Sequence, residues 1–163
     1  MRRGSTLIAC LMVLGLLFVI GLAFLGKRAA EYRAAERAGA AAQARALAEA
    51  GLEDLRLKAI KDYDFPPRNA DEQQIFVYSE DVFDTDGTTF LGTYTVSIDR
   101  QFMREPYGVW RIRSVGSAGP REAPLGRCEI YAELDIAEHD HQNLSLANPR
   151  RYEFLVWREL GGL

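Results

Sequence analysis

The sequence predicts an α+β protein, in which a long N-terminal α-helix packs on a small antiparallel β-sheet of about four strands. Two observations lead to this prediction. Residues 5–26 contain no charged side chain, and a helix-forming composition then continues without a proline as far as residue 65. From residue 75 onwards, apolar residues recur at every second position, which is the period of half-buried strands.

The chain of 163 residues divides by composition into four segments. They are a short basic N-terminus (1–4), an apolar helix (5–26), a soluble continuation of that helix (27–62) and an antiparallel sheet domain (63–163). The last segment contains ten Lys and Arg residues against seventeen Asp and Glu residues. An acidic domain of this kind repels nucleic acid, so we exclude nucleic acid as a partner.

The apolar run is long enough to cross a membrane. Its 22 residues form about 33 Å of α-helix, which spans the hydrocarbon core of a bilayer. A secretory signal has a shorter apolar region, which is followed by a small-residue cleavage site. Here Lys27 and Arg28 follow instead. The run therefore predicts a retained, single membrane span whose partner is lipid.

Residues 27–62 are rich in Ala, Glu, Arg, Lys and Leu, the strongest helix formers. Leu52, Leu55, Ala59 and Tyr63 recur at spacings of three and four, so they share one face of the helix. We expect this stripe to pack on the chain's own sheet.

The strands are predicted from alternation. Residues 92–99 place Tyr94, Val96 and Ile98 on one face. Residues 127–136 alternate in the same way. A third strand, 108–117, is joined to them by the turn 118–126. Further strand candidates are residues 75–83 and 151–157. In 127–136 we expect an inward set of Cys128, Ile130, Ala132, Leu134 and Ile136, and an outward set of Arg127, Glu129, Tyr131, Glu133 and Asp135.

No pattern of nucleophile, base and metal ligands predicts an enzyme. His139 and His141 form an HxH pair without a third ligand at a suitable spacing, which favours a solvated loop. Asp84 and Asp86 belong to a DxDG sequence similar to that of calcium loops, but an EF-hand would need an acid where Thr95 stands. The segment is therefore either a calcium site or an Asp/Gly turn, and no other cofactor is expected.

The N-terminus resembles that of the type IV pilin superfamily. The sequence Arg2-Arg3-Gly4 would be the prepilin leader, and Ser5 the first residue of the mature chain. Residues 48–54, AEAGLED, are similar to the corresponding region of PilX-like minor pilins and of the K-type pseudopilins of type II secretion. The resemblance implies that a prepilin peptidase cleaves after Gly4, that the new N-terminus is methylated, and that the apolar helix forms the core of a filament. Its filament contacts would be made by Ser5, Leu7, Ala9, Leu11, Leu14 and Leu17.

One residue departs from the family pattern. Most pilins have glutamate at the fifth mature position, which in this chain is Ala9. PilX-like and K-type subunits tend to share that departure, and they lie at or near the filament tip. The resemblance thus implies a structural minor subunit of a type IV pilus or a type II secretion pseudopilus that primes or caps assembly.

The resemblance also implies where the chain acts and with what. Its partners would be other pilin or pseudopilin subunits, the prepilin peptidase and an inner-membrane assembly platform. It would lie in the bacterial inner membrane as a single-pass protein, with its C-terminal domain outside the cytoplasm, before it enters the filament. The alternative interpretation is a static single-pass envelope protein whose sheet domain binds a partner or ligand.

Overall fold

The structure, a computed structural model, describes residues 3–62, 65–67 and 74–161, with side chains from residue 10 onwards. The chain forms two compact units, Met1–Ala38 and Gly39–Leu163. A 59-residue helix, α1 (Arg3–Lys61), contributes to both units. The second unit contains the strands β1 (Ile75–Phe83), β2 (Phe90–Asp99), β3 (Val109–Ala118), β4 (Gly126–Asp135) and β5 (Phe154–Leu160).

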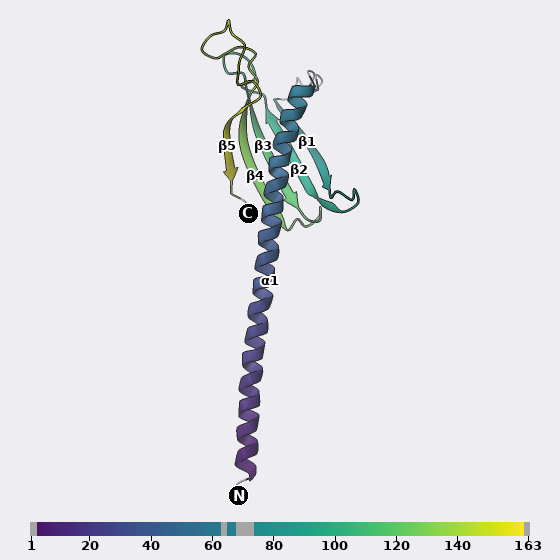
Figure 1. The fold of residues 1–163 in the computed structure, drawn as a ribbon, viewed down its shortest axis with the longest axis vertical. Helices are drawn as coiled ribbons and strands as arrows, with labels where there is room; N and C mark the ends of the chain where they lie inside the picture. The colour runs from purple at the N-terminus through teal and green to yellow at the C-terminus, as the bar shows by residue number, and fades with distance from the viewer. Residues whose placement is uncertain (1–2, 63–64, 68–73, 162–163) are drawn as a thin grey trace. The chain divides into compact units, whose positions relative to one another are not determined.

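The five strands form one antiparallel sheet in the order β1-β2-β3-β4-β5 (Figure 1). Every strand pairs with the strand that follows it, so the sheet is a simple meander. The turns at the two ends of the sheet therefore alternate: the β2–β3 and β4–β5 connections lie at one end, and the β1–β2 and β3–β4 connections at the other. The expected sheet of about four strands has five.

The residues of α1 in this unit lie across one face of the sheet, as predicted (Figure 1). Leu52 and Leu55 are fully buried and Ala59 is buried, which confirms the predicted helical stripe; Tyr63 lies outside the described residues. The predicted strand alternation is also confirmed, since the inward residues complete the same core: Tyr94, Val96, Ile98, Cys128, Ile130, Ala132 and Leu134.

Small residues allow the helix to lie close to the sheet. A Cβ atom built on Gly116 would lie 2.0 Å from the Ala44 carbonyl oxygen, and one on Gly126 would lie 2.4 Å from that of Ala40. From the helix side, a Cβ on Gly51 would lie 2.6 Å from the Ser114 hydroxyl. Because no side chain fits at these three positions, glycine sets the distance between helix and sheet.

Polar groups also join the helix to the edge strand β1. Lys58 Nζ lies 2.7 Å from Asp54 Oδ2 and also contacts Glu80 of β1. The hydroxyl of Tyr78 donates to Asp54 Oδ2 at 3.0 Å, and that of Tyr94 donates to Glu80 Oε2 at 2.9 Å. Burial, together with these neighbouring carboxylates, raises the pKa of both tyrosines above the ordinary value.

One outward strand residue is buried although an exposed side chain was expected. Asp135 was expected to point outward, but it is only 1% exposed. It is the last residue of β4, and the returning β4–β5 connection covers it: Tyr152 N donates to the Asp135 carbonyl at 2.6 Å, and Asp135 N donates to the Glu153 carbonyl at 3.0 Å. Its neighbour Ile136 is half-buried against the core, as expected.

Candidate functional site

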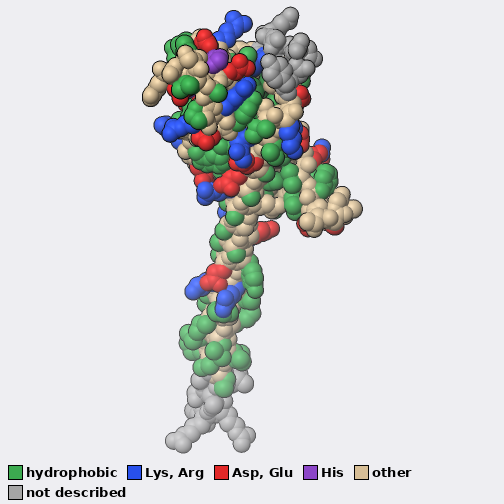
Figure 2. All heavy atoms as spheres, turned by 45° about the horizontal axis from the view of Figure 1, so that its top comes forward, with side chains coloured by type: hydrophobic (Ala, Val, Ile, Leu, Met, Phe, Trp, Pro, Cys, Tyr) green, Lys and Arg blue, Asp and Glu red, His purple; other side chains and the backbone are tan. Residues whose placement is uncertain are grey.

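The main candidate functional surface is the apolar part of α1. Leu11, Leu14 and Leu17 are 61%, 62% and 58% exposed, and the other large apolar residues from Met12 to Leu25 are exposed as well. Figure 2 shows hydrophobic side chains gathered along this stretch. By length and composition, α1 can cross a membrane as a single span. In water this surface would be costly, so it requires lipid or other apolar helices around it.

The predicted processing site lies in the least described part of the chain. Met1 and Arg2 lie outside the described residues. Gly4 and Ser5 belong to α1, as do Leu7 and Ala9, but their side chains are outside the description. The peptidase site and the first filament contacts therefore stay predictions.

A compact group of charges follows the apolar stretch. Arg28 Nη1 lies 3.1 Å from Glu31 Oε2, and Lys27 Nζ lies 3.9 Å from Glu31 Oε1. The Arg28 guanidinium also lies 5.2 Å from the centre of the Phe24 ring. An arginine whose guanidinium lies over an aromatic ring and beside a carboxylate suits the boundary between lipid and water.

The acidic DxDG segment forms a turn between β1 and β2. Asp86 Oδ1 accepts hydrogen bonds from the backbone N–H groups of Thr88 (2.8 Å) and Thr89 (2.9 Å), and Asp86 Oδ2 accepts from the Thr89 hydroxyl at 2.6 Å. These donors hold the pKa of Asp86 below its usual range. Within the described residues, no group of three or more His, Cys, Asp and Glu side chains is placed to hold a metal ion. Calcium binding by Asp84 and Asp86 stays a prediction, which a calcium titration of the melting temperature would check.

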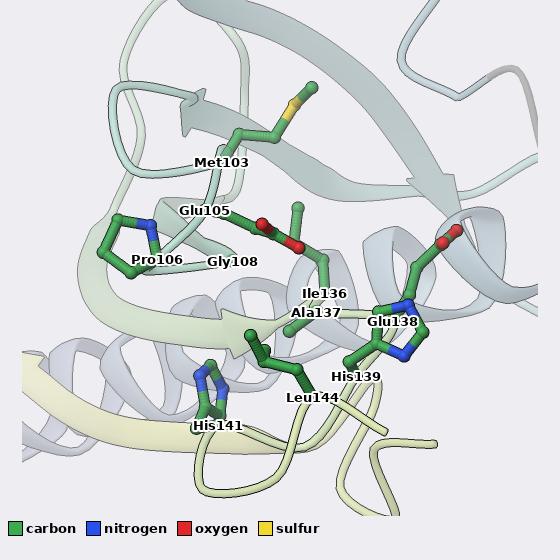
Figure 3. Close-up of a pocket in the computed structure, with 10 residues that line it drawn as sticks. All are labelled: Met103, Glu105, Pro106, Gly108, Ile136, Ala137, Glu138, His139, His141 and Leu144. Carbon is green, nitrogen blue, oxygen red and sulfur yellow. The ribbon is translucent and has the colours of Figure 1, made fainter. Parts of the chain in front are cut away.

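The two histidines line a cavity at one end of the sheet (Figure 3). The cavity has a volume of about 380 Å³ and lies between the β2–β3 and β4–β5 connections. His141 is anchored, since its Nε2 lies 3.1 Å from Oδ2 of the buried Asp135. Both histidines are exposed loop residues, in line with the expected solvated loop. The sequence predicted neither the cavity nor the pairing of His141 with Asp135.

A local signal for Asp135 was present in the sequence. An aspartate at the end of a strand often accepts the N–H of the residue two positions on, which forms an Asx turn. Asp135 Oδ1 does accept from Ala137 N, at 3.0 Å. Strand alternation alone could not reveal this, because it gives the face of a residue and not the connection that covers that face.

Comparisons of this chain with protein-family models, with curated proteins and with solved structures find no match. The resemblance to pilins therefore stays an expectation from the sequence, based on residues 2–26 and 48–54.

Proposed function

We propose that this chain is a minor subunit of a type IV pilus or a type II secretion pseudopilus. One observation supports the proposal most: α1 exposes an uninterrupted apolar surface from Leu11 to Leu25 and then continues as the helix that packs on the sheet. A filament subunit of this kind needs a helix that is stable first in lipid and later among other apolar helices. The leader-like sequence before this helix, Arg2-Arg3-Gly4, adds support.

The chain's own part in this function is structural. The apolar helix holds the subunit in the inner membrane, and the sheet domain folds around its own core outside the cytoplasm. The covalent and mechanical steps belong to partners: the prepilin peptidase removes the leader, and an assembly ATPase and a platform protein extract the subunit into the filament.

Ala9 supports a place at the tip of the filament. In the apolar core of such a filament, each new N-terminal amine is a cation that is costly unless it is paired. In this family a glutamate of the subunit added next is thought to pair with it, and Ala9 has no carboxylate for that task. The amine of Ser5 could still pair with the glutamate of a subunit added later. The chain therefore suits the first position, where nothing precedes it, and it would prime or cap the filament.

Processing tests the proposal directly. When the full chain is co-expressed with a prepilin peptidase, the intact mass should correspond to a chain that begins at Ser5, with or without one added methyl group. Gly4→Leu should block cleavage, because the peptidase needs close approach to a residue without Cβ. Gly26→Leu is the matched control, since a Cβ at Gly26 has no neighbour within 4 Å.

The alternative interpretation, a static anchor, gives the opposite result. A wild-type chain that keeps Arg2 and Arg3 in a native membrane containing an active prepilin peptidase would refute the pilin proposal.

A further inference from the structure

The cavity between the β2–β3 and β4–β5 connections has two ordered walls. The first wall belongs to the β2–β3 connection. Outside the lining residues, the rings of Phe102 and Tyr107 meet edge to face at 5.2 Å, and the guanidinium of Arg111 in β3 lies 3.9 Å from the centre of the Phe102 ring. Backbone hydrogen bonds from Met103 N to the Arg100 carbonyl and from Val109 N to the Phe102 carbonyl close this connection. These contacts fix the path of the backbone in this connection.

The second wall is tied to the first by direct contact. Ile136 N donates to the Gly108 carbonyl at 2.8 Å. Gly108 has a φ of +57°, and a Cβ on it would lie 2.6 Å from the Ala137 Cβ. The side chain of Asn148 donates to the Ala137 carbonyl at 3.2 Å, which fixes the rest of the β4–β5 connection. The cavity is an open hollow, since most of its lining residues are exposed, and its volume of about 380 Å³ falls in the range of small-ligand sites.

One polar side chain of the cavity, His141, can offer a hydrogen-bond acceptor to a ligand. In a neutral imidazole one ring nitrogen donates and the other accepts. Since Nε2 of His141 faces the buried Asp135 carboxylate, the neutral ring donates there and keeps Nδ1 as an acceptor. Within the described residues, Nδ1 has no hydrogen-bond partner. Asp135 thus acts as a positioning residue for His141.

The charged side chains that line the cavity are acidic. Glu105 and Glu138 line it, and no Lys or Arg is among its described lining residues. Glu138 lies 3.6 Å from Arg151, whereas Figure 3 shows the Glu105 side chain extending towards Ile136. The remaining lining is mostly apolar and consists of Met103, Pro106, Ile136, Ala137 and Leu144.

We propose that this cavity binds an organic cation: an ammonium or guanidinium group on a short apolar stem. The charged group donates to the Glu105 carboxylate and to Nδ1 of His141, while the stem packs on Ile136 and the neighbouring apolar residues. The same chemistry is present in a free alkylamine and in the Lys or Arg side chain of a protein. This proposal is independent of the proposed filament function.

The two histidines make the test specific, because they are the only two in the chain and both line the cavity. The full chain, ¹⁵N-labelled at histidine and held in detergent micelles, is titrated with n-butylammonium and with n-butylguanidinium. We expect saturable shifts of both imidazoles, with the His141 Nδ1 signal moving as it accepts a hydrogen bond. n-Pentanol, which has a similar stem and no charge, should bind more weakly.

Variants separate this site from general attraction to an acidic domain. Glu105→Gln should weaken binding of the cation by about 1.5- to 5-fold, the range for an exposed ion pair. Glu122→Gln makes the same change in the exposed β3–β4 connection, at the other end of the sheet, and should leave binding unchanged.

A further titration distinguishes the two possible sources of the cation, a free amine and a protein side chain. A short acetylated peptide with a central lysine should bind more tightly than n-butylammonium if the natural ligand is a protein side chain, and more weakly if it is a free amine. Three results would overturn the proposal: the absence of saturable shifts, equal binding of pentanol, or equal effects of Glu105→Gln and Glu122→Gln.

Discussion

Two leucines of α1, two residues apart, provide a test of how the helix faces the sheet. Leu55 is fully buried, whereas Leu57 is 46% exposed. Leucines that touch only their own helix, such as Leu14 and Leu17, are 62% and 58% exposed. Leu57 is therefore exposed by about three quarters as much as a leucine on an isolated helix, so the sheet and its connections cover only about a quarter of its available surface.

The expected costs follow from these exposures. Leu55→Ala removes three buried carbon atoms, worth about 2.5 kcal/mol in transfer free energy, and the cavity left behind adds to this loss; such substitutions cost roughly 2–5 kcal/mol in total. Leu57→Ala should cost only about 0.5 kcal/mol. For a domain of this size, one kcal/mol shifts the melting temperature by roughly 3–5 °C. Leu55→Ala should therefore melt about 6–25 °C below the wild type, and Leu57→Ala within about 3 °C of it.

Tryptophan fluorescence of the full chain in detergent provides the assay. The chain has two tryptophans, Trp110 and Trp157, and both belong to the sheet domain, so the signal reports on that domain. Trp110 is buried in the core and should become exposed on unfolding. Equal shifts for the two leucine variants would refute the assignment of the buried helix face.

Two other predictions concern the pKa of Tyr78 and the proposed place of the chain in a filament. The pKa of Tyr78 is raised in the folded state, so as the pH rises the unfolded chain loses the tyrosine proton first. The free energy of unfolding should therefore fall as the pH rises above about 10. Urea denaturation across that pH range measures the fall, which should be shallower in Tyr78→Phe. If the chain occupies the filament tip, deleting it should reduce the number of filaments without changing their helical symmetry, and antibodies should label one end; a reconstruction with this chain in every repeat of the shaft would contradict the tip position.

The main elements were predictable because each has its own period in the sequence. A helical period of 3.6 identified Leu52 and Leu55 as core residues, and a strand period of two did the same for Val96. The close approach of helix and sheet was not predictable in the same way. In the sequence, the alanines of residues 40–48 indicate only helix propensity. That Ala44 lies against Gly116 and Ala40 against Gly126 becomes visible only when helix and sheet are packed together.

The cavity could not be predicted from periodicity at all. Its walls come from two connections about thirty residues apart in the chain, and they meet because the meander returns both to the same end of the sheet. His141 by itself suggested only an HxH pair. Its role depends on Asp135, whose burial is set by the path of the β4–β5 connection.

The proposed assembly also needs a source of free energy other than the hydrophobic effect. Lipid tails are as apolar as leucine, so moving Leu11, Leu14 and Leu17 from the bilayer into a bundle of apolar helices changes their hydrophobic free energy little. Helices in such surroundings associate through close packing at small residues and through pairing of polar groups. A Cβ built on Gly15 or Gly21 would have no neighbour within 4 Å. Because these two residues lack a side chain, a neighbouring helix could approach closely there. In the proposed filament, the work of extraction would therefore come from the assembly machinery, while packing and pairing of the amine at Ser5 would determine which subunit follows.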